Sequence, residues 1–453
     1  IEYIYIILIE RIYLMYLKKI KLHNFRCYEK AEIDFHKQLT VIVGKNGSGK
    51  TSILEATAIA LGTWFAGFNN IVGKSINKTT DPLRKAYIIG TTDDVQQQFP
   101  VEIEASARIK ESDAEDINWK RTVNTPIGTM TTKEAKELID YACEYQKAIS
   151  DGNTNIQLPI IAYYGTGRLW DYHRQKKVDV FKVSSRTNGY IDSLDGTANV
   201  KLMMGWFLNK TINKYQRQEE NIKENPELDT VYLAMEKCLS MLSGYSSVKI
   251  RYSMNTQELD VYYSESDGQR MRIPLSQLSD GYKGAISLVA DIAYRMATLN
   301  PQLGMDILEK GDGVVLIDEV DLHLHPAWQQ KVLNNLTDIF PNVQFIVTTH
   351  APSVINSVKK ENIRMLSDGE VVETDNQVYG KDINSVLKEI MQVDERPENF
   401  IMLFDEFYKK LSENKYLEAE KILDKLEQMR GSHDPEIARC RVKLKLENIR
   451  RKS

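Results

Sequence analysis

Hydrophobic positions recur along most of the chain with one of two periods, and the period predicts the type of element. Apolar and polar residues alternate over 16–25 and 30–35, which predicts two strands of a half-buried sheet. The same alternation predicts strands at 101–109, 119–123, 248–254 and 258–263. Because alternation places one face in the core and one in water, these segments predict an antiparallel part of the molecule.

Four other segments are mainly apolar without alternation. They span residues 39–43, 158–164, 313–317 and 344–349. Short apolar runs of this kind are typical of strands that are buried on both faces, as in a parallel sheet. They predict a mixed α/β core.

Helical periodicity occupies much of the remaining sequence. Apolar residues within 52–61 have the spacing of one buried helix face. Further helices are predicted at 131–149, 198–220, 226–242, 282–299, from about 326, 398–412, 415–429 and 435–450. The pair 198–220 and 226–242 could form a short lid or hairpin. The polar, glycine-containing stretch 63–81 is predicted to be a surface loop.

These patterns predict a division of the chain into parts. An N-terminal lobe at 15–196 precedes the short helical insertion at 197–245, a C-terminal lobe at 246–376 follows it, and 377–453 is an all-helical region for a partner or for dimerisation. Residues 1–14 could be a non-native extension, because Met15 begins a much more regular strand. We assign them no function.

Composition restricts the function classes. The 453 residues carry a net charge of −4, which argues against a generally basic nucleic-acid binder, so any such contact must come from local basic patches. The four cysteines are too far apart for a zinc or redox pair. The apolar start is interrupted by Glu2, Glu10 and Arg11, so it falls short of the roughly 20 residues of a membrane span. We expect a cytoplasmic protein without a membrane contact.

Residues 44–51 fit G-x-x-x-x-G-K-[ST], between the strand at 39–43 and the helix at 52–61. In this position glycines let backbone N–H groups approach phosphate oxygens, and the helix N-terminus adds its dipole. The residues expected to bind ATP here are Gly44, Asn46, Gly47, Gly49, Lys50, Thr51 and Ser52. Lys50 would reach the β and γ phosphates, and Thr51 would hold Mg²⁺. The alternative is a chance glycine-rich turn before a helix.

An acidic pair, Asp318 and Glu319, ends the buried strand at 313–317. Asp318 is predicted to hold Mg²⁺ through water, and Glu319 to polarise the attacking water as general base. The alternative is an acidic pair that caps a helix after a core strand.

His350 ends the strand at 344–349. A lone histidine after a strand is usually structural, but this strand points to the same sheet edge as Asp318, where open α/β sheets bind ligands. His350 could therefore sense the γ phosphate and belongs with Glu319 among the predicted catalytic residues. His323 and His325 have no evident third ligand, so we favour a turn into a helix near Pro326 over a metal site.

Residues 278–282, LSDGY, resemble the LS-G-Q/Y signature of ABC-type ATPases, and a predicted helix follows them. Walker A, signature, Walker B and a histidine at a strand end occur in the order of that family. The resemblance implies an ABC-ATPase head fold. It also implies that the signature of one subunit closes on ATP held by another, so Ser279 and Gly281 should act in trans within a homodimer around two ATP molecules; a higher oligomer remains open.

The segment NFRCYEK at 24–30 looks like the N-F-R start of the RecF and SMC group. In that group the arginine lies by the nucleotide phosphates, which assigns this role to Arg26. The sequence differs from these families at two places. The interval between Lys50 and Asp318 is too short for the coiled-coil arms of SMC proteins, and GTGRLW at 165–170 stands where ABC proteins usually carry a Q-loop glutamine.

Four further segments, beginning at residues 16, 58, 162 and 316, together look like the PtuA-type ATPases of the Septu and retron-associated defence group. That resemblance implies slow ATP hydrolysis, a role in antiphage defence and an HNH nuclease partner. Two alternatives stay open: a RecF-like DNA-repair ATPase, and a nucleotide sensor with negligible turnover.

The predicted C-terminal helices carry an apolar stripe that includes Leu411, Leu423 and Met429. We favour packing of this stripe on the ATPase head or on a neighbouring helix, with a docking platform for a partner as the alternative. Basic residues recur from Arg439 to Lys452, usually the mark of a solvated helix face, and could contact a phosphate backbone.

Overall fold

The computed structural model describes residues 15–89, 92–109, 115–169, 185–196, 200–219, 226–264, 269–367, 369–372, 377–391, 396–431 and 434–452. The predicted extension 1–14 lies outside the described residues, as do the predicted boundary residues 197 and 376. The chain forms two compact units, Ile1–Ile383 and Asn384–Ser453. The division into four predicted parts stays a prediction.

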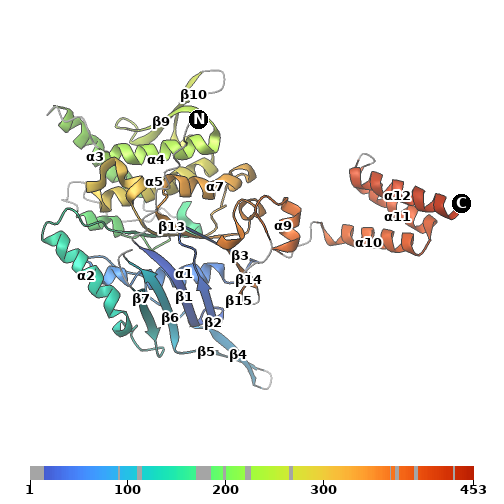
Figure 1. The fold of residues 1–453 in the computed structure, drawn as a ribbon, viewed down its shortest axis with the longest axis horizontal. Helices are drawn as coiled ribbons and strands as arrows, with labels where there is room; N and C mark the ends of the chain where they lie inside the picture. The colour runs from blue at the N-terminus through green and yellow to red at the C-terminus, as the bar shows by residue number, and fades with distance from the viewer. Residues whose placement is uncertain are drawn as a thin grey trace, which may run out of the picture. The chain divides into compact units, whose positions relative to one another are not determined.

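A six-stranded sheet forms the centre of the first unit (Figure 1). Its order is β15 (Glu370–Val372), β14 (Ile363–Ser367), β3 (Leu39–Gly44), β13 (Val343–Thr349), β12 (Gly313–Ile317) and β8 (Ile160–Tyr164). All neighbours pair in parallel except β14 and β15. The four mainly apolar segments are adjacent here, and β8, β12 and β13 are buried at every position, which confirms the prediction of doubly covered strands.

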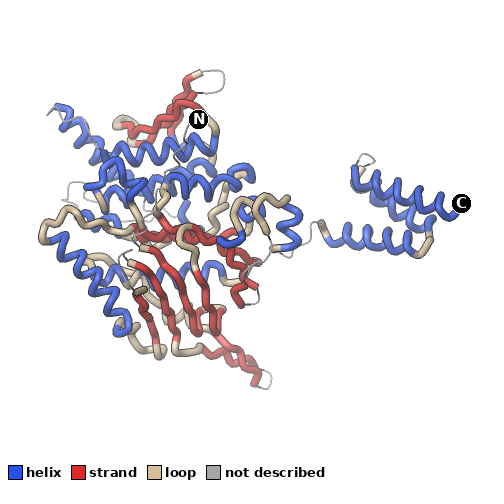
Figure 2. The backbone as a smooth tube through the Cα atoms, viewed as in Figure 1, coloured by secondary structure: helices blue, strands red, loops and turns tan. Residues whose placement is uncertain are grey.

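A four-stranded antiparallel sheet lies beside the central sheet. Its order is β2 (Tyr28–Asp34), β1 (Tyr16–Phe25), β6 (Val101–Arg108) and β7 (Ile117–Val123). In β6 buried and half-buried positions alternate without exception, as the period of two predicts. Figure 2 shows these strands as a separate layer from the parallel sheet.

Helix α1 (Lys50–Leu61) contacts strands of both sheets and so lies between them. Gln344 also joins the two layers: its amide nitrogen donates to the carbonyl oxygens of Leu17 and His36, at 2.8 and 2.9 Å. The Leu17 amide donates back to Gln344 Oε1 at 2.8 Å. Because Gln344 is fully buried, these bonds satisfy polar groups that would otherwise be costly. They fix the antiparallel layer against the strand that ends at His350.

The third sheet is small and antiparallel, with the order β11 (Arg270–Pro274), β10 (Glu258–Ser264) and β9 (Ser246–Ser253). It lies with the helical part of the first unit in Figure 1, where α4 contacts β9. The predicted hairpin and helical pair are confirmed, and the pair comprises α3 (Val200–Glu219) and α4 (Pro226–Ser243). The long helix α5 (Asp280–Leu299) packs on α4.

The remaining elements of the first unit are short or peripheral. They are the hairpin β4 (Arg84–Ile89) and β5 (Thr92–Gln97), and the helices α2 (Lys136–Ser150), α6 (Ile307–Lys310), α7 (Pro326–Ile339), α8 (Pro352–Ile355) and the start of α9 (Ile383–Glu389). Alternation alone did not predict the β4–β5 hairpin. In the part of the chain that the structure describes, no helix is long and apolar enough to span a membrane.

The prediction of a surface loop at 63–81 is wrong for its first part. Trp64 and Phe65 are fully buried in a 3₁₀ turn, Trp64–Gly67, shortly after α1. The Trp64 indole N–H donates to the Tyr190 hydroxyl at 3.2 Å, so the polar edge of this buried ring is satisfied. The prediction gave too much weight to the polar residues that follow this turn.

The second unit contains a helical bundle of α10 (Glu398–Ser412), α11 (Tyr416–Arg430) and α12 (Pro435–Lys452). The bundle has its own core, made by Phe404, Phe407, Leu411, Ala419, Leu423, Leu426, Ile437, Cys440 and Leu444. Most of the predicted apolar stripe is therefore buried against neighbouring helices, as we favoured. Met429 is an exception, because it is exposed.

Candidate nucleotide-binding site

The loop between β3 and α1 has the backbone that a phosphate cradle needs. Gly47 and Gly49 have φ values of 81° and 94°, which favour glycine over any residue with a side chain. At Gly49 a Cβ atom would also lie 2.4 Å from the Tyr28 hydroxyl. That hydroxyl donates to the Ser48 carbonyl oxygen at 2.9 Å, so strand β2 holds the loop in place.

Lys50, the first residue of α1, is 7% exposed and turns back over this loop. Its ammonium donates to the carbonyl oxygens of Gly44 at 2.7 Å and Lys45 at 3.0 Å. Burial lowers the pKa of Lys50, and the carboxylates of Asp318, Glu319 and Asp321 oppose that shift. A cation held in this way is available to anionic oxygens that enter the loop.

Asp318 receives a hydrogen bond on each carboxylate oxygen. Thr51 Oγ1 donates to Oδ2 at 2.8 Å, and Thr348 Oγ1 donates to Oδ1 at 2.5 Å. The Asp318 amide donates to the carbonyl oxygen of Tyr164 at 2.7 Å. Three neighbouring strand ends and the start of α1 therefore converge on one buried carboxylate.

Glu319 follows in a left-handed backbone conformation, with φ of 47°. Its amide donates to Thr348 Oγ1 at 2.8 Å, and its Oε1 lies 3.2 Å from His350 Nε2. Both side chains are about one-third exposed, so the pair is accessible to solvent. Positive φ is strained for a glutamate, and such strain is typical of functional sites.

The chemistry of these residues fits ATP and Mg²⁺. The Ser48 hydroxyl is buried without a hydrogen-bond partner among the described residues, and it lies within the glycine loop where a phosphate oxygen could accept from it. A threonine hydroxyl and an aspartate provide the oxygen ligands that Mg²⁺ prefers. The described residues contain no group of three or more histidine, cysteine or acidic side chains able to hold a metal ion.

His325 caps α7, because its Nδ1 accepts from the Ala327 amide at 3.3 Å. This agrees with the predicted turn into a helix at Pro326.

Arg26 lies close to α1 but is engaged with carboxylates. Its Nε donates to Asp81 Oδ1 at 3.0 Å, and its Nη2 lies 3.7 Å from Glu55 Oε2. Glu55 also pairs with Lys74 at 2.5 Å. Glu55 is one helical turn beyond Thr51, so this cluster lies beside the loop, and the predicted contact of Arg26 with phosphate stays a prediction.

The predicted signature lies at the start of α5. Ser279 is the exposed residue before the first turn, while Gly281 is buried. A Cβ at Gly281 would lie 2.8 Å from the His323 carbonyl oxygen and 2.9 Å from the Trp328 ring. Gly281 thus allows α5 to approach the segment after Asp318. The structure describes no contact of Ser279 or Gly281 with Lys50, and the role of both residues in trans stays a prediction.

Sequence reasoning missed Thr348 and Tyr164. Thr348 bonds both predicted acidic residues, and the signal was a hydroxyl residue within an otherwise apolar strand. Tyr164 occupies the strand end where a Q-loop was sought. Its hydroxyl donates to Asp291 Oδ2 on α5 at 2.7 Å, and Arg295 Nε donates to the same oxygen at 2.7 Å. Tyr164 therefore connects helix α5 to the Asp318 amide.

The comparisons with known proteins find AAA domains and probable ATPases. Residues 19–243 match a family described as an AAA domain, and residues 178–356 match an AAA domain described as a putative AbiEii toxin of a type IV toxin–antitoxin system. The retron Vc95 probable ATPase of Vibrio cholerae is 28% identical over 428 residues, with 84% of this chain and 80% of that protein covered. Septu protein PtuA of Bacillus thuringiensis is 25% identical, with 88% and 90% covered.

Among solved structures, the SMC head bound to the C-winged helix domain of ScpA is 18% identical, with a TM-score of 0.44, and 79% of this chain and 97% of that chain are covered. The predicted fold class, a mixed α/β head with antiparallel sheets and a helical C-terminal region, is confirmed by the sheets and helices described above. The chain is homologous to the retron probable ATPases and to Septu PtuA, and both family models that match it describe AAA domains.

Proposed function

We propose that this chain binds Mg-ATP and hydrolyses it slowly within a homodimer, and that the state of the dimer controls a partner nuclease in antiphage defence. The observation that carries the proposal is the double hydrogen bonding of Asp318 by Thr51 and Thr348, beside Lys50 and the Glu319–His350 pair. Lys50, Thr51 and the acidic pair are thus close enough to act on one nucleotide, which supports the proposal.

The residues divide the chemistry among them. Lys50 and the loop amides bind the phosphate oxygens, and Thr51 and Asp318 hold Mg²⁺, which neutralises negative charge on the phosphates. Glu319 accepts a proton from the attacking water. His350, 3.2 Å from Glu319, orients that carboxylate and can donate to the γ phosphate.

The incompleteness of this site within one chain supports the dimer. Ser279 is exposed and no described contact links it to Lys50, whereas SMC-like heads close a signature onto ATP held by a partner. An exposed serine at the start of a twenty-residue helix offers a hydroxyl and backbone amides to a phosphate. Two copies would therefore complete two sites.

The defence role rests on the retron and Septu relatives, and the nuclease partner on the resemblance to the Septu group. A gene for an HNH nuclease next to the gene for this chain, and co-purification of the two products, would support it. ATP-dependent binding of DNA ends without a dedicated nuclease would favour the RecF-like alternative instead. Phosphate release no higher than that of a Glu319→Gln variant would favour the nucleotide sensor.

The test compares three variants of the full chain. Lys50→Ala should lose ATP binding, because it removes the buried cation of the loop. Glu319→Gln should bind ATP normally, release little phosphate and elute as a dimer with ATP, because binding and closure are kept while the base is lost. Lys30→Ala, an exposed lysine on β2, is the matched control and should behave as the wild type. Titration calorimetry measures ATP binding, and light scattering measures the mass of the dimer. Undiminished ATP binding by Lys50→Ala would overturn the proposal.

A further inference from the structure

The small sheet β9–β10–β11 has a basic outward face with a tyrosine at its centre. Tyr262 on β10 pairs in register with Lys249 on β9 and with Arg272 on β11, so the three side chains share one face. Arg251 and Arg270 lie two positions along their strands and therefore on that face too. We call Lys249, Arg251, Tyr262, Arg270 and Arg272 the basic face.

This face is directed to water. The side chains of Lys249 and Arg272 are 61% and 57% exposed, and Tyr262 is 37% exposed. On the opposite face Ile250 and Val261 are fully buried, whereas Met271 at the edge of the sheet is 37% exposed. Four cations and an aromatic ring are thus presented on a rigid sheet.

Two buried carboxylates hold the cations in place: Asp260, which lies on the same face two residues before Tyr262, and Glu236 of α4. Arg272 donates to Asp260 Oδ2 from Nη2 at 2.6 Å and from Nε at 3.2 Å. The Arg272 guanidinium carbon lies 5.6 Å from the Tyr262 ring centre. Glu236 of α4 accepts from Arg251 at 2.6 Å and from Lys249 at 3.3 Å. Both of these carboxylates are buried, and the exposed carboxylate on this face is Glu258, which accepts from Ser276 Oγ. The four cations thus outnumber the exposed carboxylate of the face.

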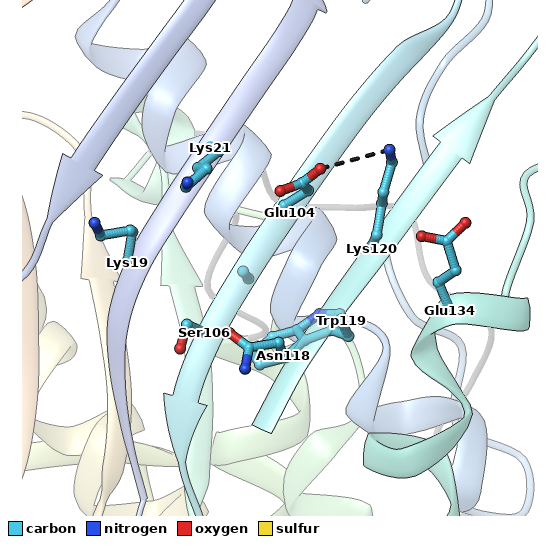
Figure 3. A pocket seen from close by; sticks show the side chains of 9 residues that line it. Lys19, Lys21, Glu104, Ser106, Asn118, Trp119, Lys120 and Glu134 are labelled. Carbon is cyan, nitrogen blue, oxygen red and sulfur yellow. Dashed lines mark ion pairs between the residues drawn. The ribbon is translucent and has the colours of Figure 1, made fainter. Parts of the chain in front are cut away.

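The polar face of the sheet β2–β1–β6–β7 provides a contrast (Figure 3). It holds a shallow cavity of about 270 Å³ whose lining includes Lys19, Lys21, Glu104 and Lys120. On this face lysines and glutamates oppose each other across neighbouring strands: Lys21 pairs in register with Glu32 and Glu104, and Glu104 pairs with Lys120. Lys120 also lies 3.5 Å from Glu104 and 2.7 Å from Glu102. Here carboxylates such as Glu104 are themselves exposed and would repel a phosphate, whereas the carboxylates that pair with cations of the basic face are buried.

We propose that the basic face binds single-stranded nucleic acid. Lys249, Arg270 and Arg272 would contact successive phosphates, and Tyr262 would stack on an unpaired base. The ring favours a single strand over a duplex, because the bases of a duplex are stacked on one another and leave no face for a side chain. The overall charge of −4 does not oppose this, since the attraction comes from a local cluster.

The position of the face suggests a consequence for the proposed ATPase cycle, and this step rests on the proposed function. Strand β11 ends at Pro274 and continues through a 3₁₀ turn, Leu275–Gln277, into Ser279. Ser276 Oγ in this turn donates to Glu258 Oε2 on β10 at 2.9 Å. A strand bound on the sheet therefore lies at the base of the predicted signature, where it could change closure on ATP.

The test measures binding by the full chain without nucleotide, so that its result is independent of ATP hydrolysis. Fluorescence anisotropy would follow labelled oligo(dT) and oligo(rU) of about 20 nucleotides, with a duplex of equal length as comparison. The double variant Lys249→Ala/Arg270→Ala should bind at least about tenfold more weakly, and the slope of log affinity against log salt should fall by about 1.4 for two phosphate contacts. Tyr262→Ala should bind at least about fivefold more weakly with little change in slope.

Arg272 is kept in both variants, because its removal would leave buried Asp260 unpaired. Arg439→Ala/Lys445→Ala on α12 is the matched control for general basicity, and it should bind as the wild type. Binding of DNA, RNA or both supports the proposal and identifies the sugar. Equal affinity of all variants, a loss confined to the α12 variant, preference for the duplex, or no binding of either oligonucleotide would overturn it.

Discussion

Thr348 connects the two acidic residues of the candidate site. One hydroxyl donates to Asp318 and accepts from the Glu319 amide, so it sets the carboxylate of the first residue and the backbone of the second. The left-handed backbone of Glu319 is held by this bond. Residues that orient a metal ligand from behind typically change metal affinity or activity by about 10–100-fold when they are replaced.

We therefore predict that Thr348→Val lowers the rate of ATP hydrolysis by about 10–100-fold. Valine has the shape of threonine but neither donates to Asp318 nor accepts from Glu319. Phosphate release under saturating ATP is the measurement, with the melting temperature recorded for each protein. Thr348→Ser keeps the hydroxyl and should retain most activity. Equal loss in the serine and valine variants would show that packing rather than hydrogen bonding matters at this position.

Among the elements, α5 connects two parts of the predicted site. It begins at the predicted signature, and Asp291 in its buried middle accepts a hydrogen bond from Tyr164. Both connections require its first turn to lie close to the segment 321–328, where Tyr282 packs on Trp328 with ring centres 4.1 Å apart. Gly281 permits this approach. The glycine of the signature is thus explained by packing within one chain, in addition to any contact with a partner's ATP.

For this element we predict that Gly281→Ala weakens ATP-dependent dimerisation and hydrolysis while ATP binding is kept. A methyl group would push the start of α5 away from the His323 carbonyl oxygen, and overpacking of this kind costs roughly 1–3 kcal/mol. Nucleotide titration and light scattering separate the two effects. Gly205→Ala on α3 is the control, because a Cβ there meets nothing within 4 Å. A Gly281→Ala protein that dimerises like the wild type would contradict the prediction.

At the scale of the whole molecule, the predicted site belongs to one of the two units. All predicted site residues lie between Arg26 and His350, within the first unit. The nine core residues of the bundle all come from α10, α11 and α12. The bundle thus has a hydrophobic core of its own, which is the usual mark of an independent domain.

Removal of residues 396–453 should therefore leave ATP affinity within about twofold of the full chain, because the loop, Asp318 and their supports remain. Titration calorimetry on the shortened and full chains is the measurement. If a nuclease associates through the bundle, the shortened chain should also fail to retain it in a pull-down. Loss of ATP binding would show that the two units are not independent.

Local patterns predicted most elements because each depends on a few neighbouring residues. The strand at 39–43, the glycine loop and the helix after it could be placed from spacing alone. The buried 3₁₀ turn at Trp64 and the β4–β5 hairpin could not, since a short turn or ribbon has too few residues to show a period. The bundle helices were placed well, because a three- to four-residue repeat over fifteen positions is a strong signal.

The sequence by itself determined the loop, the acidic pair, the histidine and the elements that carry them, because these motifs are contiguous and their chemistry follows from residue type. Only the tertiary structure decided which groups meet. Strand order puts β13 beside both β3 and β12, so Thr348 reaches Asp318, and the β2 strand brings Tyr28 to the loop. The tertiary structure also pairs Arg26 with Asp81 and places four cationic side chains on the same sheet face as Tyr262. Such contacts depend on sheet register and on residues far apart in the chain, so local hydrophobic periodicity cannot predict them.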